Sequence, residues 1–378
     1  MSEKSSVPGP TVLAPYLDAV TSVFHPIAHP LVNASNRFNA WKENFGLVQP
    51  GTVEGLTREI SQVHLANWFF EGARADVSKV ISANPAFQLQ HSFALGGQSG
   101  GKYNFGAIWT NNQTFLQGGV DGSGAVTMRA NQNWDRRNTT KIQGQLTSEA
   151  GRSMLQAEHD ILGDHYSVNL KTINPGVLDG TGIHIGSIFH SLSPRLSAGF
   201  ETVVHSQSPG AFETATSWMA KLTSLPSASS LASAALTPVG QAPIPMPFNP
   251  SWTATAQLQS TGNIQTTYYQ KVSDKVDVAL DFQTVFQPES MMGPAKRDAV
   301  ATLGAKYDFR LATFRAQLDS TWKVGMLLEQ RFTPAFAFLV GGEIDHKKNT
   351  SRFGVGIMIE SSSMTQEEMI AAGMLQPV

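Results

Sequence analysis

The chain has 378 residues, no cysteine, a net charge of -2 and only 15% charged residues, against roughly 25% in ordinary soluble domains. It therefore has no disulfide framework or thiolate metal site, and its net charge gives no bulk attraction to nucleic acid. No run of eighteen apolar residues occurs, which excludes a membrane-spanning helix. A β-barrel stays possible, because lipid-facing and lumen-facing residues alternate along its strands and average out in composition.

Residues 1–50 contain prolines at positions 8, 10, 15, 26, 30 and 50, which break any long helix. We expect an extended leader with one short helix near residues 16–24. The first twenty residues have neither the apolar core of a secretory signal nor the Arg-rich, acid-free composition of a transit sequence. If the chain is a barrel, this favours synthesis in the cytosol and insertion into the outer membrane of an organelle.

A helical repeat follows at 52–67. Val53, Leu56, Ile60 and Val63 recur at the spacing of one helix face, and Glu54 falls in the first turn, where an acid is favourable. The pattern predicts an amphipathic helix that ends near Asn67.

From Phe70 onward the repeat changes to two. In 86–95, for example, apolar side chains alternate with Gln88, Gln90 and Ser92, as in a strand with two different faces. Turn residues separate successive runs. The pattern predicts nineteen strands, at 70–81, 86–95, 102–110, 113–121, 125–134, 138–147, 152–160, 165–172, 181–190, 195–205, 212–221, 251–259, 263–271, 275–285, 298–309, 312–321, 322–330, 335–345 and 351–359, of which 212–221 is the weakest.

Two segments interrupt this pattern. Residues 223–250 are rich in Ser, Ala and Pro and are typical of a long exposed loop. The tail 361–378 begins as a polar linker, after which Thr365 and Glu368 form the capping-box pattern of a short terminal helix. The strand region therefore covers 70–360.

Charged residues fall almost entirely on one face of the predicted strands. In 312–321, Phe314, Ala316 and Leu318 oppose Arg315 and Asp319. A charge that faces lipid at mid-depth costs about 2–4 kcal/mol, so a membrane barrel requires this separation. A soluble sandwich could show it in single strands, but rarely across so many strands with so few charges. His91 and His159 are the main exceptions. The pattern favours an all-β transmembrane barrel.

An enzyme is not expected. Residues 97–101 match the G-x-S-x-G motif, but that motif needs a strand-to-helix turn, and here it joins two strands. His184 and His190 share a strand face but lie roughly 20 Å apart, too far to bind one metal. We predict no catalytic residue, metal or cofactor.

The inward faces of 275–345 are predominantly acidic. They carry seven acids against three bases, namely Asp277, Asp281, Asp308, Asp319, Glu329, Glu343 and Asp345 against Lys306, Arg315 and Lys323. Glu158, Asp160 and Glu201 add acids in mid-chain. The inward faces of the earlier strands are mixed, with Arg74, Lys102, Arg129 and Lys141 against Asp76 and Asp121. One interpretation is a hydrated wall in which acids and bases pair. The other is an acidic track for cationic cargo, since rings of acidic side chains make a pore selective for cations.

The C-terminal hairpin connects the chain with a known family. The pattern formed by Arg352, Gly354, Ile357 and Ile359 resembles the insertion signal of mitochondrial β-barrels. More specifically, the chain resembles the channel-forming subunits of the translocase of the outer mitochondrial membrane, of fungal type. The matching stretches run in order across about 50–360, namely PGTVEGLTREI at 50–60, FEGARADVSK at 70–79, NPAFQ at 84–88, GAKYDF at 304–309 and GEIDHKKN at 342–349.

This resemblance implies a nineteen-stranded barrel closed by parallel pairing of 70–81 with 351–359, with the helix 52–67 inside the lumen. It also implies import of unfolded precursors across the outer mitochondrial membrane, in a dimer or trimer with a receptor subunit and small single-helix subunits. The leader would hand cargo to intermembrane-space chaperones. Basic presequences would bind lumenal acids, here Asp277, Asp281, Glu329, Glu343, Asp345, Glu158 and Asp160. Apolar lumenal residues such as Ile108, Val285 and Leu327 would suit uncharged hydrophobic carrier proteins.

Two alternatives remain open on the sequence. A metabolite channel of the voltage-dependent anion type has the same barrel and a lumenal helix, but Lys and Arg should predominate in its lumen. A soluble β-sandwich binding module would be released from membranes by carbonate extraction.

Overall fold

A computed structural model describes residues 47, 49–96, 100–149, 151–176, 180–208, 211–224, 250–287, 296–333 and 335–362. The chain divides into the units Met1–Leu47 and Val48–Val378, and the described residues from 49 onward all belong to the second unit. The predicted terminal helix and nearly all of the predicted leader (1–50) and of the predicted loop at 223–250 lie outside the described residues.

The described residues of the second unit form nineteen strands, as predicted, and the predicted ends differ from the observed ends by at most three residues. The strands are β1 (Gly72–Ala83), β2 (Ala86–Leu95), β3 (Lys102–Thr110), β4 (Thr114–Asp121), β5 (Val126–Asn133), β6 (Asn138–Leu146), β7 (Met154–Leu162), β8 (Tyr166–Ile173), β9 (Gly182–Ser191), β10 (Leu196–Ser208), β11 (Ala211–Thr223), β12 (Trp252–Leu258), β13 (Ile264–Ser273), β14 (Val276–Gln287), β15 (Lys296–Asp308), β16 (Ala312–Asp319), β17 (Lys323–Thr333), β18 (Phe336–Asp345) and β19 (Thr350–Ser362).

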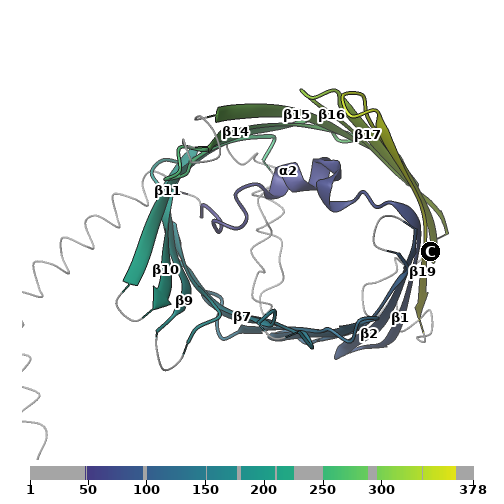
Figure 1. Cartoon of the computed structure of the whole chain (residues 1–378), viewed down its shortest axis with the longest axis horizontal. Helices are drawn as coiled ribbons and strands as arrows, with labels where there is room; N and C mark the ends of the chain where they lie inside the picture. The colour runs from purple at the N-terminus through teal and green to yellow at the C-terminus, as the bar shows by residue number, and fades with distance from the viewer. Residues whose placement is uncertain are drawn as a thin grey trace, which may run out of the picture. The chain divides into compact units, whose positions relative to one another are not determined.

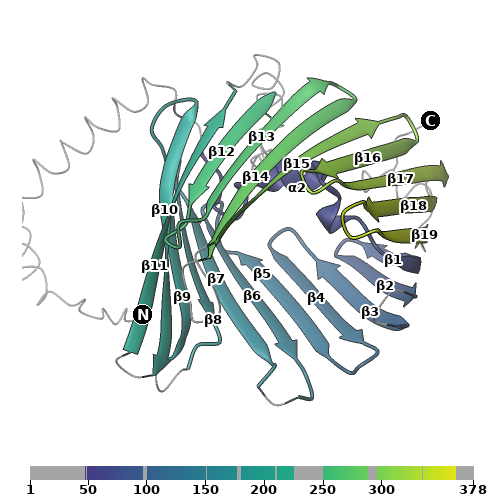
Figure 2. The same cartoon turned by 45° about the horizontal axis from the view of Figure 1, so that its top comes forward.

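Each strand pairs in antiparallel fashion with the next along the chain, and the sheet closes where β1 pairs with β19 (Figure 2). That last pairing is parallel, with Gly72 opposite Gly354 and Val80 opposite Ser362. An odd number of alternating strands makes the first and last run in the same direction, so closure requires a parallel pair. The closed sheet leaves no free edge along these strands, as a membrane environment demands.

The strand register confirms the two-faced pattern and explains its exceptions. His91 and His159 lie on the outer face, yet each has a hydroxyl partner on the neighbouring strand. His91 Nδ1 is 2.9 Å from the Tyr103 hydroxyl, and His159 Nδ1 is 2.9 Å from Thr140 Oγ1. A neutral imidazole with a hydrogen-bond partner costs far less in an apolar setting than a charge does. His184 is a further outward histidine, and its Nδ1 lies 3.0 Å from Thr172 Oγ1.

A short helical segment lies inside the ring of strands (Figure 1). It consists of α2 (Arg58–Val63) followed by a 3-10 turn, η1 (Leu65–Asn67). The α-helix is shorter than the predicted 52–67, because a bend at 53 and turns at 54–57 precede it, and Gly55 N donates there to Thr52 O at 3.0 Å. Gly55 also weakens a helix there, since glycine costs about 1 kcal/mol relative to alanine. Neither helix of the described residues has the length and apolar character needed to cross a membrane.

Candidate functional site

The lumenal segment Gly51–Phe70, here called the inner belt, is held along the barrel's inner wall. At its start, Ser167 on β8 donates to the Gly51 carbonyl at 2.7 Å. Leu56 then packs against Phe189 and Met219, which project inward from β9 and β11 and are themselves buried. Apolar contact of this kind binds the segment to the wall without a covalent link.

The middle of the inner belt is α2, whose apolar side packs on β13 and β14. Ile60 and Val63 form a buried cluster with Tyr269 and Ala279, and Val63 is 1% exposed. On the neighbouring side of α2, Glu59 forms an ion pair with Lys221 at 3.3 Å. The spacing that predicted a helix face therefore identified the residues that bind the wall.

Cationic side chains of the wall hold the end of the inner belt. The Arg315 guanidinium lies over the Trp68 ring at 4.1 Å and donates through Nε to the Gln62 carbonyl at 3.3 Å. The Arg352 guanidinium lies 5.6 Å from the centre of the Phe69 ring. Stacking of this kind contributes up to about 2 kcal/mol per pair when water is excluded. The inner belt is therefore fixed by wall residues up to β19, next to the start of β1.

Glycines on the inner face make room for the inner belt. A side chain at Gly304 would place its Cβ 2.8 Å from the His64 ring, and one at Gly325 would lie 2.8 Å from Leu65 Cδ1. At Gly356 the Cβ would lie 2.8 Å from the Phe70 ring, and at Gly354 it would collide with the Phe70 carbonyl. The wall under the inner belt is thus shaped to receive it.

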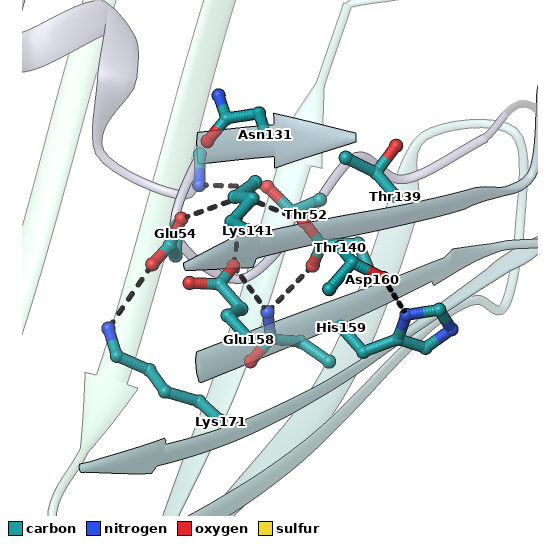
Figure 3. A network of polar contacts seen from close by, with 12 residues as sticks. Thr52, Glu54, Asn131, Thr139, Thr140, Lys141, Glu158, His159, Asp160 and Lys171 are labelled. Atoms are coloured by element: carbon teal, nitrogen blue, oxygen red, sulfur yellow. Dashed lines mark hydrogen bonds and ion pairs between the residues drawn. The ribbon is translucent and has the colours of Figure 1, made fainter. Parts of the chain in front are cut away.

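A buried ionic cluster lies near the start of the inner belt (Figure 3). Lys141 on β6 pairs with Glu158 at 2.8 Å and with Asp160 at 2.7 Å, both on β7. The Asn169 amide donates to the same two carboxylates at 2.7 and 2.6 Å. Glu158 and Asp160 are 3% and 4% exposed. These two predicted cargo acids are therefore brought together, but they are buried and already neutralised in part by Lys141.

Glu54 connects the inner belt to this cluster. Its carboxylate lies 3.4 Å from Lys141 Nζ and 3.3 Å from Lys171 Nζ, and Figure 3 shows it between the two lysines. Burial alone would raise the pKa of Glu54, but the two lysine charges outweigh burial and lower it. The carboxylate therefore stays ionised at neutral pH and holds the inner belt to the wall through its ion pairs with the two lysines.

Three more of the predicted acids are also engaged. Glu343 pairs with Lys323 at 2.8 Å and accepts a hydrogen bond from Arg352. Glu329 lies 3.4 Å from Arg331 and 3.9 Å from Arg315. Asp345 accepts main-chain hydrogen bonds from residues 347 and 348, which closes the turn between β18 and β19.

Asp277 and Asp281 differ from the other five. Both project inward from β14 and are partly exposed, and neither forms an ion pair with another described residue. Asp277 interacts with the Tyr269 hydroxyl, and the lysines opposite it in the register, Lys271 and Lys306, pair instead with Asp274 and Asp308. Asp281 accepts hydrogen bonds from the amides of Gln265 at 3.2 Å and Gln283 at 2.7 Å. These two carboxylates are therefore the predicted acids that remain available for a positive charge in the lumen.

Leu327 is not available to cargo, contrary to the prediction. It is 0% exposed, and both it and Phe69 of the inner belt approach Gly341. Of the predicted insertion signal, Arg352 and Gly354 face inward and Ile357 and Ile359 face outward, on β19. Across the described ranges, no group of three His, Asp or Glu side chains is arranged to hold a metal ion.

The docking of the inner belt is expected to weaken in mild acid. Burial lowers the pKa of His64, although the Ala279 main chain and the Asp281 charge act in the opposite direction. A lowered folded pKa means that protonation favours the undocked segment. Docking is then strongest above the ordinary histidine pKa of about 6.5 and weakens as pH falls below it.

This pH effect can be read from thiol labelling. The chain has no cysteine, so Val63→Cys introduces one buried reporter. We expect the labelling rate, corrected for thiol ionisation, to rise as pH is lowered from 7 toward 5 (roughly the histidine range). The same reporter with His64→Gln should show no such rise, and a flat profile with His64 present would contradict the assignment.

Comparison with known proteins agrees with this architecture. Residues 49–354 match the eukaryotic porin family. The mitochondrial import receptor subunit tom40 of Neurospora crassa is 36% identical, over 89% of this chain and 90% of that protein. The corresponding TOM40 of Saccharomyces cerevisiae is 31% identical over 93% and 88%, and the human TOM40 homolog 26% over 83% and 79%. The chain therefore belongs to the eukaryotic porin family and, within it, to the Tom40 subunits.

Proposed function

We propose that this chain is the protein-conducting channel of an import complex in the outer mitochondrial membrane. The observation that carries the proposal is the near full-length similarity to proteins named mitochondrial import receptor subunits, on a closed barrel with polar lumenal strands. An anion-selective metabolite pore is not favoured, because these relatives are import subunits and the lumenal charges of this chain are mixed. No enzymatic step is involved.

The cargo is an unfolded precursor polypeptide. Basic presequences are attracted to the lumenal acids, and Asp277 and Asp281 are the strongest candidates because the described partners of both are uncharged: Tyr269 for Asp277, and Gln265 and Gln283 for Asp281. Glu329, Glu343, Asp345, Glu158 and Asp160 contribute less, since wall residues already engage them. Charge-lined clefts raise the local concentration of oppositely charged ligands.

The proposed assembly is the one that the resemblance to translocase channel subunits implies. The chain acts as a dimer or trimer with a receptor subunit and small single-helix subunits, surrounded by membrane lipid, and passes cargo to intermembrane-space chaperones. Arg352, Gly354, Ile357 and Ile359 serve as the membrane-insertion signal. Ile357 and Ile359 suit this role because they project outward, where an insertion machinery or lipid can contact them.

The import rate of basic cargo is expected to depend on Asp277 and Asp281. Asp277→Asn together with Asp281→Asn should slow import of precursors with basic presequences by about three- to tenfold, and leave carriers without presequences near the parent rate. Mitochondria that carry only the variant would be tested with both cargo classes. Asp345→Asn is the matched control, because that acid closes a turn. Equal slowing of both classes, or of neither, would show that the two acids only hydrate the wall.

A further inference from the structure

An open pocket lies on the outer face of the barrel, between two neighbouring hairpin turns. The turns join β16 to β17 and β18 to β19, in the part of the wall where β15–β19 lie side by side (Figure 2). The cavity measures about 560 Å³. We call it the turn pocket, and it is lined by Ala299, Ser320, Thr321, Trp322, His346 and Lys347.

Trp322 is held in the turn pocket by a strained backbone. Its φ angle is 64°, in the left-handed region that a bulky side chain rarely adopts. The Asp319 carboxylate fixes this turn, because it accepts hydrogen bonds from the main-chain N–H groups of Thr321 at 2.8 Å and Lys323 at 3.0 Å. The indole is 69% exposed, and its N–H has no hydrogen-bond partner among the described residues. A strained, exposed tryptophan with an unused donor indicates a binding role.

Cations gather at the turn pocket, whereas the acids of the same turns face the lumen. Lys347 and Lys348 are exposed, and neither forms an ion pair with another described residue. Arg297 also projects outward, from the start of β15. Asp319 and Asp345 lie on the inward face and accept main-chain hydrogen bonds within their own turns. The outer side of this barrel end is therefore positively charged.

The outer face next to the turn pocket is apolar. Leu303, Leu318 and Ile344 are exposed there, and they project outward from β15, β16 and β18. Tryptophan is enriched where the hydrocarbon of a bilayer meets its headgroups. The turn pocket thus lies where the apolar wall ends and the charged turns begin, at the level of the lipid headgroups.

These features match an anionic phospholipid. Its phosphate oxygens accept hydrogen bonds from ammonium groups and from an indole N–H, and its acyl chains can cover the apolar wall. A zwitterionic headgroup carries a cation of its own, which the lysines repel. A soluble phosphate would meet the same cations but would gain nothing from the apolar wall.

We propose that the turn pocket binds the headgroup of an anionic phospholipid, with Lys347 and Lys348 supplying the positive charge and Trp322 an indole donor. This goes beyond the proposed import function, since it requires only that the barrel lies in a membrane.

Quenching by spin-labelled lipids tests the site. The chain has no cysteine, so Leu318→Cys places a single fluorescent label beside the turn pocket without filling it. The labelled full chain is reconstituted in phosphatidylcholine vesicles that contain either spin-labelled phosphatidylglycerol or spin-labelled phosphatidylcholine. Met128→Cys carries the control label, because Met128 is also exposed on the outer face but lies on β5.

Phosphatidylglycerol should be enriched over phosphatidylcholine at the Leu318 label by about 5- to 25-fold, since each lysine near a membrane surface contributes about fivefold. At the Met128 label the enrichment should stay below about twofold. Equal quenching by the two lipids at Leu318, or equal enrichment at both labels, would overturn the proposal.

Charge variants separate this site from a general attraction of anionic lipid to the barrel. Lys347→Gln with Lys348→Gln should reduce the enrichment at the Leu318 label to less than about twofold. The matched control, Lys275→Gln with Arg310→Gln, removes two exposed bases from turns at the opposite end and should keep the enrichment. An equal loss in this control, or no loss in the lysine variant, would contradict the site.

Inorganic phosphate distinguishes a lipid from a soluble ligand. An excess of phosphate should lower the enrichment no more than chloride of the same ionic strength, because only screening is involved. Displacement beyond that of chloride would assign the turn pocket to a soluble phosphate and overturn the lipid proposal.

Trp322→Asn separates binding from folding. Asparagine adopts the left-handed region more readily than tryptophan, so this variant should unfold in detergent at the parent temperature or above. The enrichment at the Leu318 label should nevertheless fall by about two- to tenfold, because the indole donor is lost. A lower unfolding temperature, or unchanged enrichment, would contradict the role assigned to Trp322.

Discussion

Replacing Lys141 with methionine is expected to destabilise the barrel by about 3–5 kcal/mol, the usual cost of removing one partner from a buried ion pair. Lys141 is the cation that pairs with both Glu158 and Asp160, and those acids are 3% and 4% exposed. Without it, two carboxylates remain buried beside each other with only the Asn169 amide between them. Thermal unfolding of the purified barrel in detergent would measure the loss.

Two further variants separate this cause from a general loss of packing. Lys141→Met combined with Glu158→Gln and Asp160→Asn removes the charges along with their partner and should recover most of the lost stability. Lys171→Met is the matched control. Lys171 pairs with Glu54, which is 48% exposed, so its loss should cost no more than about 1 kcal/mol. If Lys141→Met unfolds like the parent, the cluster does not stabilise the fold.

Replacing Gly304 with valine is expected to dislodge the inner belt, at a cost of about 1–3 kcal/mol. The new Cβ would lie 2.8 Å from His64 Cδ2 and 3.3 Å from Val63 Cγ1, and both side chains are buried against the wall. The strand itself accepts valine well, so the strain falls on the docked segment.

The Val63→Cys reporter measures this displacement directly. Labelling should be slow in the parent and about 5- to 140-fold faster with Gly304→Val, since each 1.4 kcal/mol of lost docking is a tenfold change. Gly118→Val is the matched control, because a Cβ at Gly118 meets no atom within 4 Å. Slow labelling in Gly304→Val would mean that the inner belt can adjust and that the glycine is not needed for its docking.

The strands could be predicted closely from sequence because each must separate two environments. Alternation such as that in 86–95 repeats nineteen times, and its register places the same side chains inward in the structure. The weak strand 212–221 also forms, as β11, where Thr214 and Thr216 on the outer face give little contrast with Ser217 on the inner face. Pairing with β10 along its whole length stabilises it despite that low contrast.

The candidate site was less predictable. Alternation along a strand shows which face a side chain lies on, but not which residues it contacts. Glu158 and Lys141 were both assigned to the lumen, but their pairing depends on the register of β6 with β7. Leu327 faces inward as expected, yet it is fully buried where the inner belt lies. Inward glycines at 304, 325, 354 and 356 were a usable signal, since gaps on one face indicate an object packed there.

The acidic excess of 275–345 therefore has two physical meanings. Glu329 and Glu343 balance Arg315, Arg331, Lys323 and Arg352, and two of these arginines also stack on aromatic side chains of the inner belt. Asp277 and Asp281 form no ion pair with another described residue, so they remain available to a cationic segment in the lumen. A charge count alone cannot separate these cases, whereas burial and partner distances do.

The proposed function requires that precursors pass through this barrel along its inward faces. The most direct test is a photoreactive residue at Gln283, with the adjacent Phe282 as control, in mitochondria that hold an arrested presequence-bearing precursor. Gln283 faces the lumen beside Asp281, and Phe282 faces outward. Crosslinks to the precursor are expected from Gln283 and none from Phe282. Equal crosslinking from both positions, or crosslinks from Phe282 alone, would contradict the proposed function.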